Sequence, residues 1–212
     1  MKRLLIIGAG GFGREVLRWA LDLPSVSRDW EVGGFLDANP KALAGYVCPY
    51  PVLADPITYR PETTDRFVCA IGKPSAKMAL CNALNKRGAE FISLIHPTAI
   101  IGDQCTIGKG CIICPGVVIT TDVSIGNFVT INLHSTIGHD AVIGDGCTLS
   151  AHVDITGFAS LGQCVFLGSH ASILPSAKVG NFAVVGAGSV VLKRVKPGVT
   201  VMGVPTKQIA GF

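Results

Sequence analysis

The chain has 212 residues, of which 49% are hydrophobic and 15% are charged, and its formal net charge is +4. This length has room for one or two domains with a sizeable core, and no apolar segment is long enough to span a bilayer. The charge is too small and too scattered to indicate nucleic-acid binding, and the N-terminal apolar run is too short for a signal peptide, so we expect a cytoplasmic protein.

The first predicted elements are a buried strand, a glycine-rich turn and an amphipathic helix. The strand covers residues 3–7, and the helix continues through Leu23. The turn between them reads Gly8-Ala9-Gly10-Gly11-Phe12-Gly13. A GxGxxG turn in this context lets the backbone approach a phosphate, and the helix N-terminus supplies amide donors. The motif by itself indicates a dinucleotide, but little more than half of a dinucleotide fold fits here. Alternatively, the glycines only permit a tight turn.

A second buried strand over residues 32–36 ends at Asp37. The Asp37 carboxylate could accept hydrogen bonds from a ribose hydroxyl or from a base. Residues 38–66 are rich in proline and turn formers, with a short extended piece at 50–53.

A third buried strand covers residues 67–71 and leads through Gly72 and Lys73 into a helix over 75–86. Open α/β sheets bind ligands at the C-terminal ends of their strands, so Gly72 and Lys73 are candidate ligand contacts. A lysine in this place is also often only solvated.

From residue 94 onward the sequence repeats with a period of six. Every sixth residue from Ile95 to Val191 is aliphatic, and a small or β-branched residue stands four places after each. This self-similarity is typical of a parallel β-helix in which a hexad forms one strand and one corner, and three hexads form one coil. Glycine often follows the aliphatic, and we expect it to adopt corner angles that a Cβ would penalise. The sequence thus predicts an α/β domain over 1–93 and an all-β domain over 94–212 with a capping tail.

The eight cysteines do not indicate a metal site or a disulfide framework. Cys105, Cys111 and Cys147 occupy the small inward position of the hexad, where a free thiol acts as a compact hydrophobe. The other five, Cys48, Cys69, Cys81, Cys114 and Cys164, form no CxxC pair with one another, and the closest spacing, Cys111 to Cys114, falls on a repeat in which Cys111 already has an interior role. We expect buried, reduced thiols.

Polar residues at the corners of the coils are candidates for catalysis. His139 is followed directly by Asp140, and a carboxylate beside an imidazole can fix its tautomer and raise its basicity. Because three hexads span eighteen residues, His139 should stack between Thr121 and Gly157, and Gly157 should leave an open space above the imidazole for a substrate. The alternative is an exposed corner histidine without a role.

His134, His152 and His170 are spaced by one coil and should form a vertical ladder. Stacked imidazoles could bind a metal, and His134 with His139 resembles the paired histidines of the γ-class carbonic anhydrases. That family needs a third histidine from an earlier coil, for which we find no convincing match. Stacking of equivalent surface positions is therefore favoured.

The chain as a whole resembles one family, the nucleotide-sugar acetyltransferases that join a small Rossmann-like domain to a left-handed β-helix. The family includes bacterial enzymes that N-acetylate UDP- or GDP-linked 4-amino sugars, and sialic acid O-acetyltransferases. The resemblance rests on residues 8–16, 35–37, 70–72, 96–99, 131–132, 138–140, 142–144, 157 and 203–205. It implies a homotrimer with acetyl-CoA in the groove between neighbouring β-helices, and a role in bacterial surface polysaccharide biosynthesis without membrane insertion.

The resemblance also implies a mechanism and a set of site residues. His139 would take a proton from the sugar amine or hydroxyl as it attacks the thioester, and Asp140 would hold and polarise the imidazole. Transfer would be direct. The acetyl-CoA groove would be lined by Asn132, Thr148, Gly157, Ser169 and Ala187. The nucleotide-linked sugar would be held by Gly10, Gly11, Phe12, Asp37, Gly72 and Lys73.

Two positions depart from the pattern of the family. Some amino-sugar members carry a histidine where this chain has Phe12, which cannot donate a hydrogen bond, and Asp140 replaces the glutamate of some members. O-acetylation of sialic acid or another sugar hydroxyl is therefore the alternative activity. A metal-dependent hydratase of the carbonic anhydrase type and a non-catalytic trimeric scaffold are the alternatives from other classes.

Overall fold

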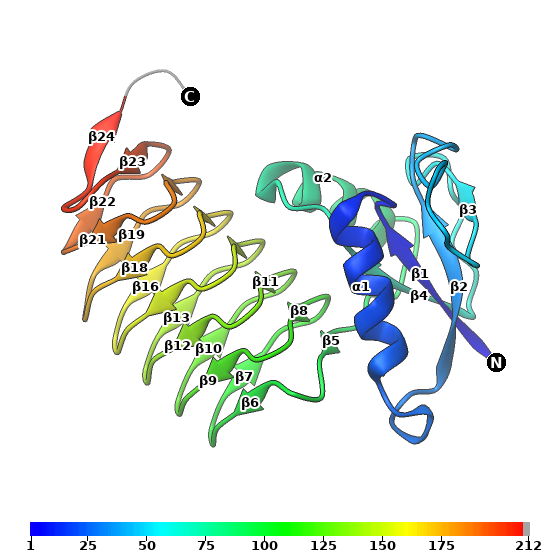
Figure 1. The fold of residues 1–212 in the computed structure, drawn as a ribbon, viewed down its shortest axis with the longest axis horizontal. Helices are drawn as coiled ribbons and strands as arrows, with labels where there is room; N and C mark the ends of the chain where they lie inside the picture. Colours follow the sequence, from blue (N-terminus) through cyan, green and yellow to red (C-terminus); the bar gives the residue numbers. More distant parts are fainter. Residues whose placement is uncertain (210–212) are drawn as a thin grey trace.

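A computed structural model of the chain describes residues 1–209, which form an α/β unit followed by a long triangular β-helix (Figure 1). The parallel sheet of the α/β unit has the strand order β3-β2-β1-β4. Its strands are β1 (Lys2–Ile7), β2 (Trp30–Leu36), β3 (Val52–Ala54) and β4 (Asp65–Cys69). Its helices are α1 (Gly11–Asp22), the short 3-10 helix η1 (Ser25–Ser27) and α2 (Pro74–Asn85). No helix within residues 1–209 is long and apolar enough to cross a membrane.

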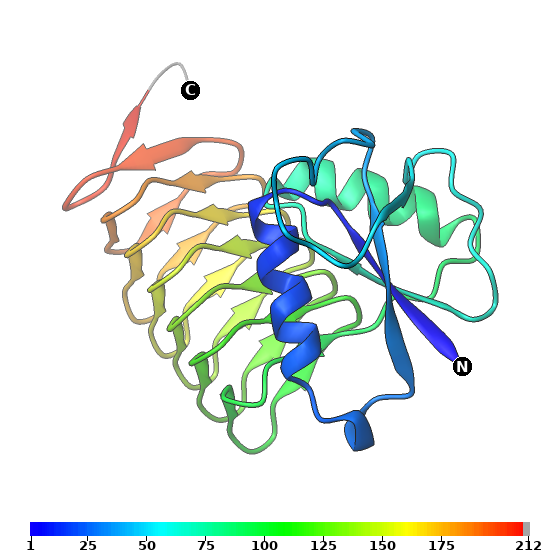
Figure 2. The same cartoon turned by 45° about the vertical axis from the view of Figure 1, so that its right-hand side comes forward.

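The two α-helices cover opposite faces of the sheet. Successive side chains of β1 point to opposite faces, so each helix packs on a different set of them. Leu4 and Ile6 belong to the core that contains α1 and the interior of the β-helix, whereas Leu5 and Ile7 belong to the core beneath α2. Figures 1 and 2 place α1 next to the coils. The α/β unit and the β-helix therefore share apolar packing.

The glycine-rich turn is as tight as the sequence predicts. Gly8 has a φ of 95°, in the left-handed region that glycine tolerates. A Cβ on Gly13 would lie 1.9 Å from the carbonyl oxygen of Gly8, so only glycine permits this approach of α1 to the end of β1.

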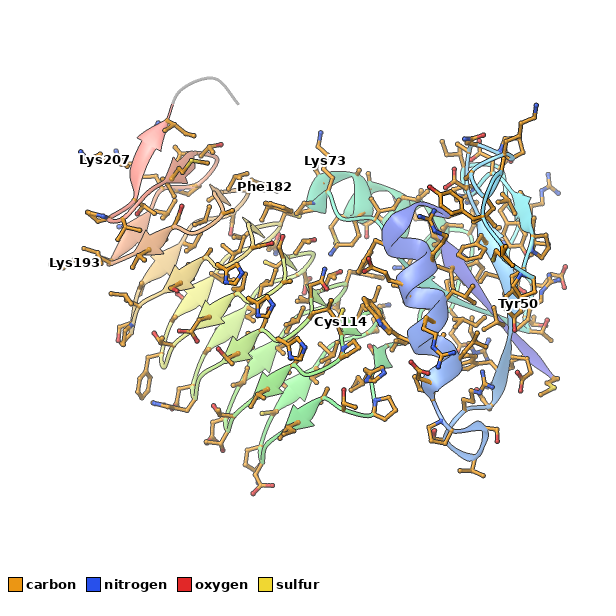
Figure 3. All side chains as sticks on the ribbon, in the orientation of Figure 1. Tyr50, Lys73, Cys114, Phe182, Lys193 and Lys207 are labelled. Carbon is orange, nitrogen blue, oxygen red and sulfur yellow. The ribbon has the colours of Figure 1, made fainter. Side chains whose placement is uncertain are left out.

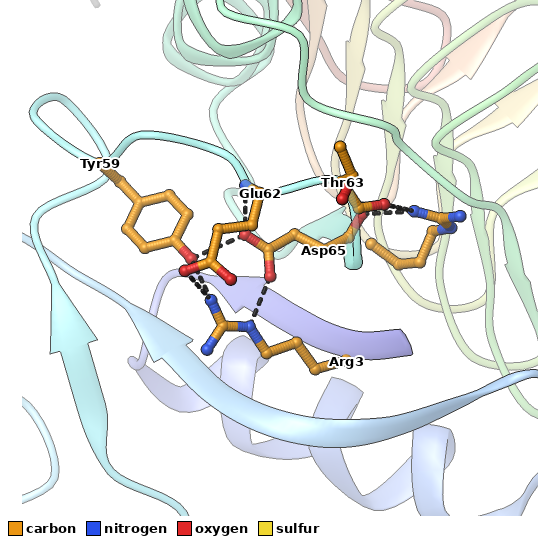
Figure 4. A network of polar contacts seen from close by, with 6 residues as sticks. Arg3, Tyr59, Glu62, Thr63 and Asp65 are labelled. Atoms are coloured by element: carbon orange, nitrogen blue, oxygen red, sulfur yellow. Dashed lines mark hydrogen bonds and ion pairs between the residues drawn. The ribbon is translucent and has the colours of Figure 1, made fainter. Parts of the chain in front are cut away.

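The predicted strand over 67–71 begins two residues earlier, at Asp65, because a buried polar network continues the strand (Figure 4). Asp65 is 1% exposed and accepts hydrogen bonds from Arg3 Nε at 2.5 Å, from the Tyr59 hydroxyl at 2.7 Å and from the Glu62 amide at 2.9 Å. Burial alone would raise the pKa of Asp65, but these donors outweigh it and hold the pKa below its ordinary value. Burial, followed by the bond to Asp65, raises the pKa of Tyr59 to about 12.

We expect Arg3→Met to weaken the fold most above about pH 4. The folded-state pKa of Asp65 is depressed, so its ionised form stabilises the fold above the unfolded-state pKa of about 3.9, and this stabilisation is lost as the pH falls through the folded-state pKa. Loss of the guanidinium should cost about 1–3 kcal/mol at neutral pH, measured by urea unfolding between pH 3 and pH 7. Lys2→Met removes an exposed ion pair with Asp29 and is the matched control, with little expected effect. Equal effects of the two variants, or an Arg3 effect independent of pH, would contradict the prediction.

The β-helix has three walls, and each wall is a sheet of parallel strands from successive coils, with β24 (Lys207–Ile209) as an antiparallel addition. Wall 1 consists of β5 (Leu94–Ile95), β8 (Ile112–Ile113), β11 (Thr130–Ile131), β14 (Thr148–Leu149), β17 (Phe166–Leu167), β20 (Val184–Val185), β23 (Thr200–Met202) and the antiparallel β24 (Lys207–Ile209). Wall 2 consists of β6 (Ile100–Ile101), β9 (Val118–Ile119), β12 (Thr136–Ile137), β15 (Asp154–Ile155), β18 (Ser172–Ile173) and β21 (Val190–Val191). Wall 3 consists of β7 (Thr106–Ile107), β10 (Ser124–Ile125), β13 (Val142–Ile143), β16 (Ser160–Leu161), β19 (Lys178–Val179) and β22 (Arg194–Val195).

The register of the walls confirms the predicted coil length. Thr130 pairs with Thr148 and Ile131 with Leu149, and the same offset recurs in every wall. The repeating aliphatics fill the interior, as in Ile131 and Ile137, which are fully buried. Ile101 is 37% exposed instead, because β6 is the edge strand of wall 2 and pairs on one side only.

The expectation that the glycines after each aliphatic adopt strained corner angles is wrong. The left-handed angles fall two residues further on, at positions such as His134 with φ 53° and Asp140 with φ 57°. The glycines instead permit close stacking of the coils. A Cβ on Gly102 would lie 2.1 Å from the carbonyl oxygen of Thr120, and one on Gly138 would lie 2.8 Å from the amide nitrogen of Gly157.

All eight cysteines are free thiols. Cys111 and Cys147 are fully buried in the predicted inward position, whereas Cys105, in the first coil, is half-buried. Burial raises the pKa of Cys147 to about 12, so this thiol stays protonated at neutral pH.

Candidate functional site

The corner between walls 2 and 3 carries an exposed histidine–aspartate pair. His139 and Asp140 follow β12, and His139 Nδ1 lies 2.8 Å from Asp140 Oδ2. The two side chains are 55% and 43% exposed. When Nδ1–H donates a hydrogen bond to the carboxylate, Nε2 keeps a free lone pair. The pair can therefore act as a general base towards a molecule bound at this corner.

The open space predicted above the imidazole is not present, because the imidazole itself occupies it. A Cβ on Gly157 would lie 2.6 Å from His139 Nε2, so the ring lies directly over this glycine. The Phe158 ring meets the imidazole edge to face at 5.1 Å between centroids. Asp140, Gly157 and Phe158 thus fix the orientation of the ring, and a substrate would reach it from the solvent side.

The corner between walls 1 and 2 carries the predicted histidine ladder. The rings of His134 and His152 lie 5.5 Å apart with an interplanar angle of 15°, and those of His152 and His170 lie 4.8 Å apart at 7°. Within residues 1–209 no group of three or more His, Cys, Asp or Glu side chains is arranged to hold a metal ion. The ladder stacks equivalent positions of successive coils, as the sequence favours.

The residues predicted to line the acetyl-CoA groove are divided between two corners. Asn132, Ser169 and Ala187 lie at the corner between walls 1 and 2, whereas Gly157 lies with His139 at the next corner. Thr148 lies within wall 1, is 5% exposed, and its Oγ1 accepts a hydrogen bond from Lys77. One chain therefore presents two separate halves of the predicted groove.

A pocket of about 490 Å³ lies at the C-terminal ends of β1 and β2, between the sheet and α2. Asp37, a predicted substrate contact, lines it together with Gly8, Asp55 and Ile71. The Asp37 carboxylate accepts hydrogen bonds at 2.8 Å from the amides of Ala9 and Asn39, so it also ties the glycine-rich turn to the end of β2.

A second pocket of about 260 Å³ lies between the start of α1 and wall 1. It brings together Phe12 and Gly72, predicted for the sugar nucleotide, with Asn132 and Thr148, predicted for acetyl-CoA. Its other lining residues are Glu15, Thr130, Ser150 and Phe166. Gly10 and Gly11 do not line it, but a Cβ on either would meet no atom within 4 Å, so the turn is open to a ligand.

Lys73 lies beside a third pocket of about 340 Å³, between the start of α2 and walls 1 and 3 (Figure 3). Phe166 and Phe182 form its aromatic lining, and Phe166 also lines the second pocket. The second and third pockets are therefore neighbours along wall 1.

Lys77 is a polar residue of this region that the sequence analysis does not single out. It is 1% exposed, and its Nζ lies 3.1 Å from Thr130 Oγ1, 3.0 Å from Thr148 Oγ1 and 3.0 Å from the Cys147 carbonyl oxygen. Burial lowers the pKa of Lys77. The sequence could have indicated this residue, because Lys77 is spaced with Cys81 and Leu84 so that all three lie on the buried face of α2.

Comparison with protein families matches both halves of the chain. Residues 3–84 match the PglD N-terminal domain, residues 92–121 match the bacterial transferase hexapeptide (six repeats), and residues 159–193 match the hexapeptide repeat of succinyl-transferase.

Two curated proteins are similar in sequence. UDP-N-acetylbacillosamine N-acetyltransferase of Bacillus subtilis (strain 168) is 31% identical over 117 residues, which is 53% of this chain and 51% of the relative. GDP-perosamine N-acetyltransferase of Escherichia coli O157:H7 is 31% identical over 144 residues, which is 64% of this chain and 61% of the relative. The chain thus spans about half to three fifths of the length of these relatives.

Solved structures are similar over almost the whole chain. WeeI from Acinetobacter baumannii AYE has 30% identity and a TM-score of 0.86, with 99% of this chain and 100% of that chain covered. PerB from Caulobacter crescentus, in complex with CoA and GDP-perosamine, has 27% identity and a TM-score of 0.88, with 99% and 98% covered.

Proposed function

This chain belongs to the family of nucleotide-sugar acetyltransferases that join a PglD-type N-terminal domain to a left-handed β-helix, and from this we propose its activity. It transfers the acetyl group of acetyl-CoA to the 4-amino group of a nucleotide-linked amino-deoxy sugar. The observation that carries the proposal is the His139–Asp140 pair, with its 2.8 Å contact and its exposed imidazole. A CoA and nucleotide-sugar complex of a structural neighbour, PerB, supports the choice of substrates.

The proposed transfer is a direct displacement at the thioester carbon. As the sugar nitrogen forms its bond to the acetyl carbon, His139 Nε2 takes a proton from that nitrogen. The carbon–sulfur bond then breaks, and the departing CoA thiolate receives the proton from the imidazolium. Asp140 holds Nδ1–H throughout and stabilises the positive charge that develops on the ring.

We propose that the active unit is a homotrimer. One chain has Asn132, Ser169 and Ala187 on one corner and His139 with Gly157 on the next. A groove between two β-helices takes one corner from each copy and so unites both halves of the predicted acetyl-CoA site.

We propose that residues 1–93 provide the main binding surface for the nucleotide-linked sugar and that residues 94–212 bind acetyl-CoA. The nucleotide occupies the pocket of about 490 Å³ beside Asp37, and the diphosphate crosses the glycine-rich turn towards Phe12 and Gly72. Eight free cysteines suit a reducing compartment, which supports a cytoplasmic enzyme of bacterial surface glycan biosynthesis.

One observation favours a hydroxyl acceptor as the second candidate. Phe12 lines the pocket of about 260 Å³ and packs edge to face on Trp19 with ring centroids 5.9 Å apart. It offers no hydrogen bond where some N-acetylating members carry a histidine. O-acetylation of sialic acid or another sugar hydroxyl is therefore the alternative.

Release of free thiol from acetyl-CoA tests the two candidates in one assay. The acceptors are GDP-perosamine, UDP- and dTDP-linked 4-amino-4,6-dideoxy sugars, and sialic acid. We expect turnover with one of the amino sugars. Turnover with sialic acid alone would establish the hydroxyl acceptor instead, and failure to turn over any acceptor or to bind acetyl-CoA would contradict the proposed transferase.

A further inference from the structure

Lys77 crosses from the α/β unit into the β-helix. Its backbone belongs to α2, but its Nζ contacts Thr130 and Thr148 on adjacent strands of wall 1 and the Cys147 carbonyl before β14. The side chain is 1% exposed, which is rare for lysine, and its removal from water is costly. A lysine that only joined the two units would not need to be buried beneath a pocket.

The contacts of Lys77 match an ammonium group. The three acceptors, at 3.0 to 3.1 Å, equal in number the three N–H donors of a protonated lysine. No carboxylate of the described chain lies among these partners. In its protonated form the ammonium is therefore hydrogen-bonded but has no carboxylate partner within residues 1–209. Burial lowers the pKa of Lys77, and an anion nearby would favour the protonated form.

The two threonine hydroxyls connect this charge to the pocket of about 260 Å³. Thr130 is 2% and Thr148 is 5% exposed, and both line that pocket. Each Oγ1 accepts a hydrogen bond from Lys77, and within residues 1–209 no acceptor is found for the hydrogen of either hydroxyl. A buried O–H without an acceptor is unfavourable, so the two hydroxyls are candidate donors to an oxygen of a ligand in this pocket.

The position of the pocket indicates which ligand oxygen would accept hydrogen bonds from the two hydroxyls. Phe12 and Gly72 line it, so it adjoins the start of α1 and the glycine-rich turn, where amide donors favour phosphate. Glu15 also lines it, but its side chain is exposed and water screens its charge, whereas Lys77 lies buried behind the hydroxyls.

We propose that Lys77 is a positioning residue that fixes Thr130 and Thr148 as paired donors to an oxygen of the diphosphate of the sugar nucleotide. The inference rests on the proposed function in that it assumes a nucleoside diphosphate-linked substrate. Lys77 itself does not touch the ligand. It sets the direction in which both hydroxyls donate and adds a positive charge behind them.

Calorimetric binding of UDP, GDP and dTDP to the full-length protein tests this proposal without turnover. For the nucleotide that wild type binds, Lys77→Met should weaken binding about tenfold and Thr148→Val several-fold, from the loss of charge-assisted and neutral hydrogen bonds. The double variant should be weaker than wild type by less than the product of the two factors, because Lys77 acts through Thr148. In Lys77→Met the KM for acetyl-CoA should stay unchanged. Lys86→Met, at an exposed position at the end of α2, is the matched control and should bind like wild type.

The outcomes separate this inference from the proposed function. Failure of wild type to bind any of the three nucleotides would contradict the nucleotide-sugar substrate. Wild-type binding with an unchanged affinity in Lys77→Met would overturn the role of Lys77 alone, as would equal losses for nucleotide and acetyl-CoA. If the variants weaken binding only of the intact sugar nucleotide, the oxygen that accepts the two hydrogen bonds belongs to the sugar, and the diphosphate assignment is overturned. Should Lys77→Met not fold, the double variant Thr130→Val with Thr148→Val must weaken nucleotide binding.

Discussion

His139→Ala is expected to lower kcat about 10²–10⁴-fold, the usual contribution of a positioned general base. The ring is 55% exposed and sits on a corner, so its removal leaves the coil interior intact and should change neither the assembly nor the thermal stability. Because the imidazole acts on the proton that moves in the transition state, the KM values for acetyl-CoA and for the acceptor should change little. Steady-state kinetics by thiol release, with calorimetry for ligand binding, measures both quantities.

The matched control for this variant is His152→Ala. His152 is also an exposed histidine, but it belongs to the stacked ladder on the neighbouring corner. We expect wild-type kcat from it. A comparable loss in both variants would contradict a specific role for His139 and would favour a function of the ladder, such as the metal-dependent alternative. Retention of full activity in His139→Ala would remove the general-base mechanism.

The sequence predicts the fold closely because the hexad period is a local rule. From β5 to β21 the wall strands obey the register read from residues such as Thr130 and Thr148, one coil apart, whereas β22 and β23 pair with a shorter offset. The rule fails where the environment of a coil differs, as at Ile101 in the edge strand β6. The rule also gives the wrong reason for the glycines that follow the aliphatics. At Gly138 a Cβ is excluded by the close approach of the next coil and not by the backbone torsion angles.

The candidate site is predictable only in part, because its pieces meet through tertiary packing. The His139–Asp140 contact joins sequence neighbours and follows from the sequence directly. The meeting of Phe12 with Asn132 in one pocket depends on how the α/β unit docks on wall 1, which no periodicity encodes. Lys77 has a weak signal, a charged residue on the buried stripe of α2, but its partners on wall 1 are known only from the structure.

The packing of Gly157 against the His139 ring leads to the second large expected effect. Gly157→Ala should lower kcat about 10- to 100-fold, because the new Cβ would lie 2.6 Å from Nε2 and 2.7 Å from Cε1 of His139 and must displace the ring. A displacement of about 1 Å at a reacting group can cost 10²-fold in rate. The backbone of Gly157 is not in the left-handed region, so alanine adds no backbone strain there and the coil should fold normally.

The double variant His139→Ala with Gly157→Ala separates the two roles expected of this glycine. If Gly157 acts by letting the imidazole lie over the next coil, the second substitution should have no further effect once the ring is gone. If it acts by lining the acetyl-CoA groove, it should lower activity and raise the KM for acetyl-CoA equally in both backgrounds. The contact with Nε2 is present in the isolated chain, whereas the proposed groove would need a second copy, so we expect the first result. Equal losses in the two backgrounds would contradict it.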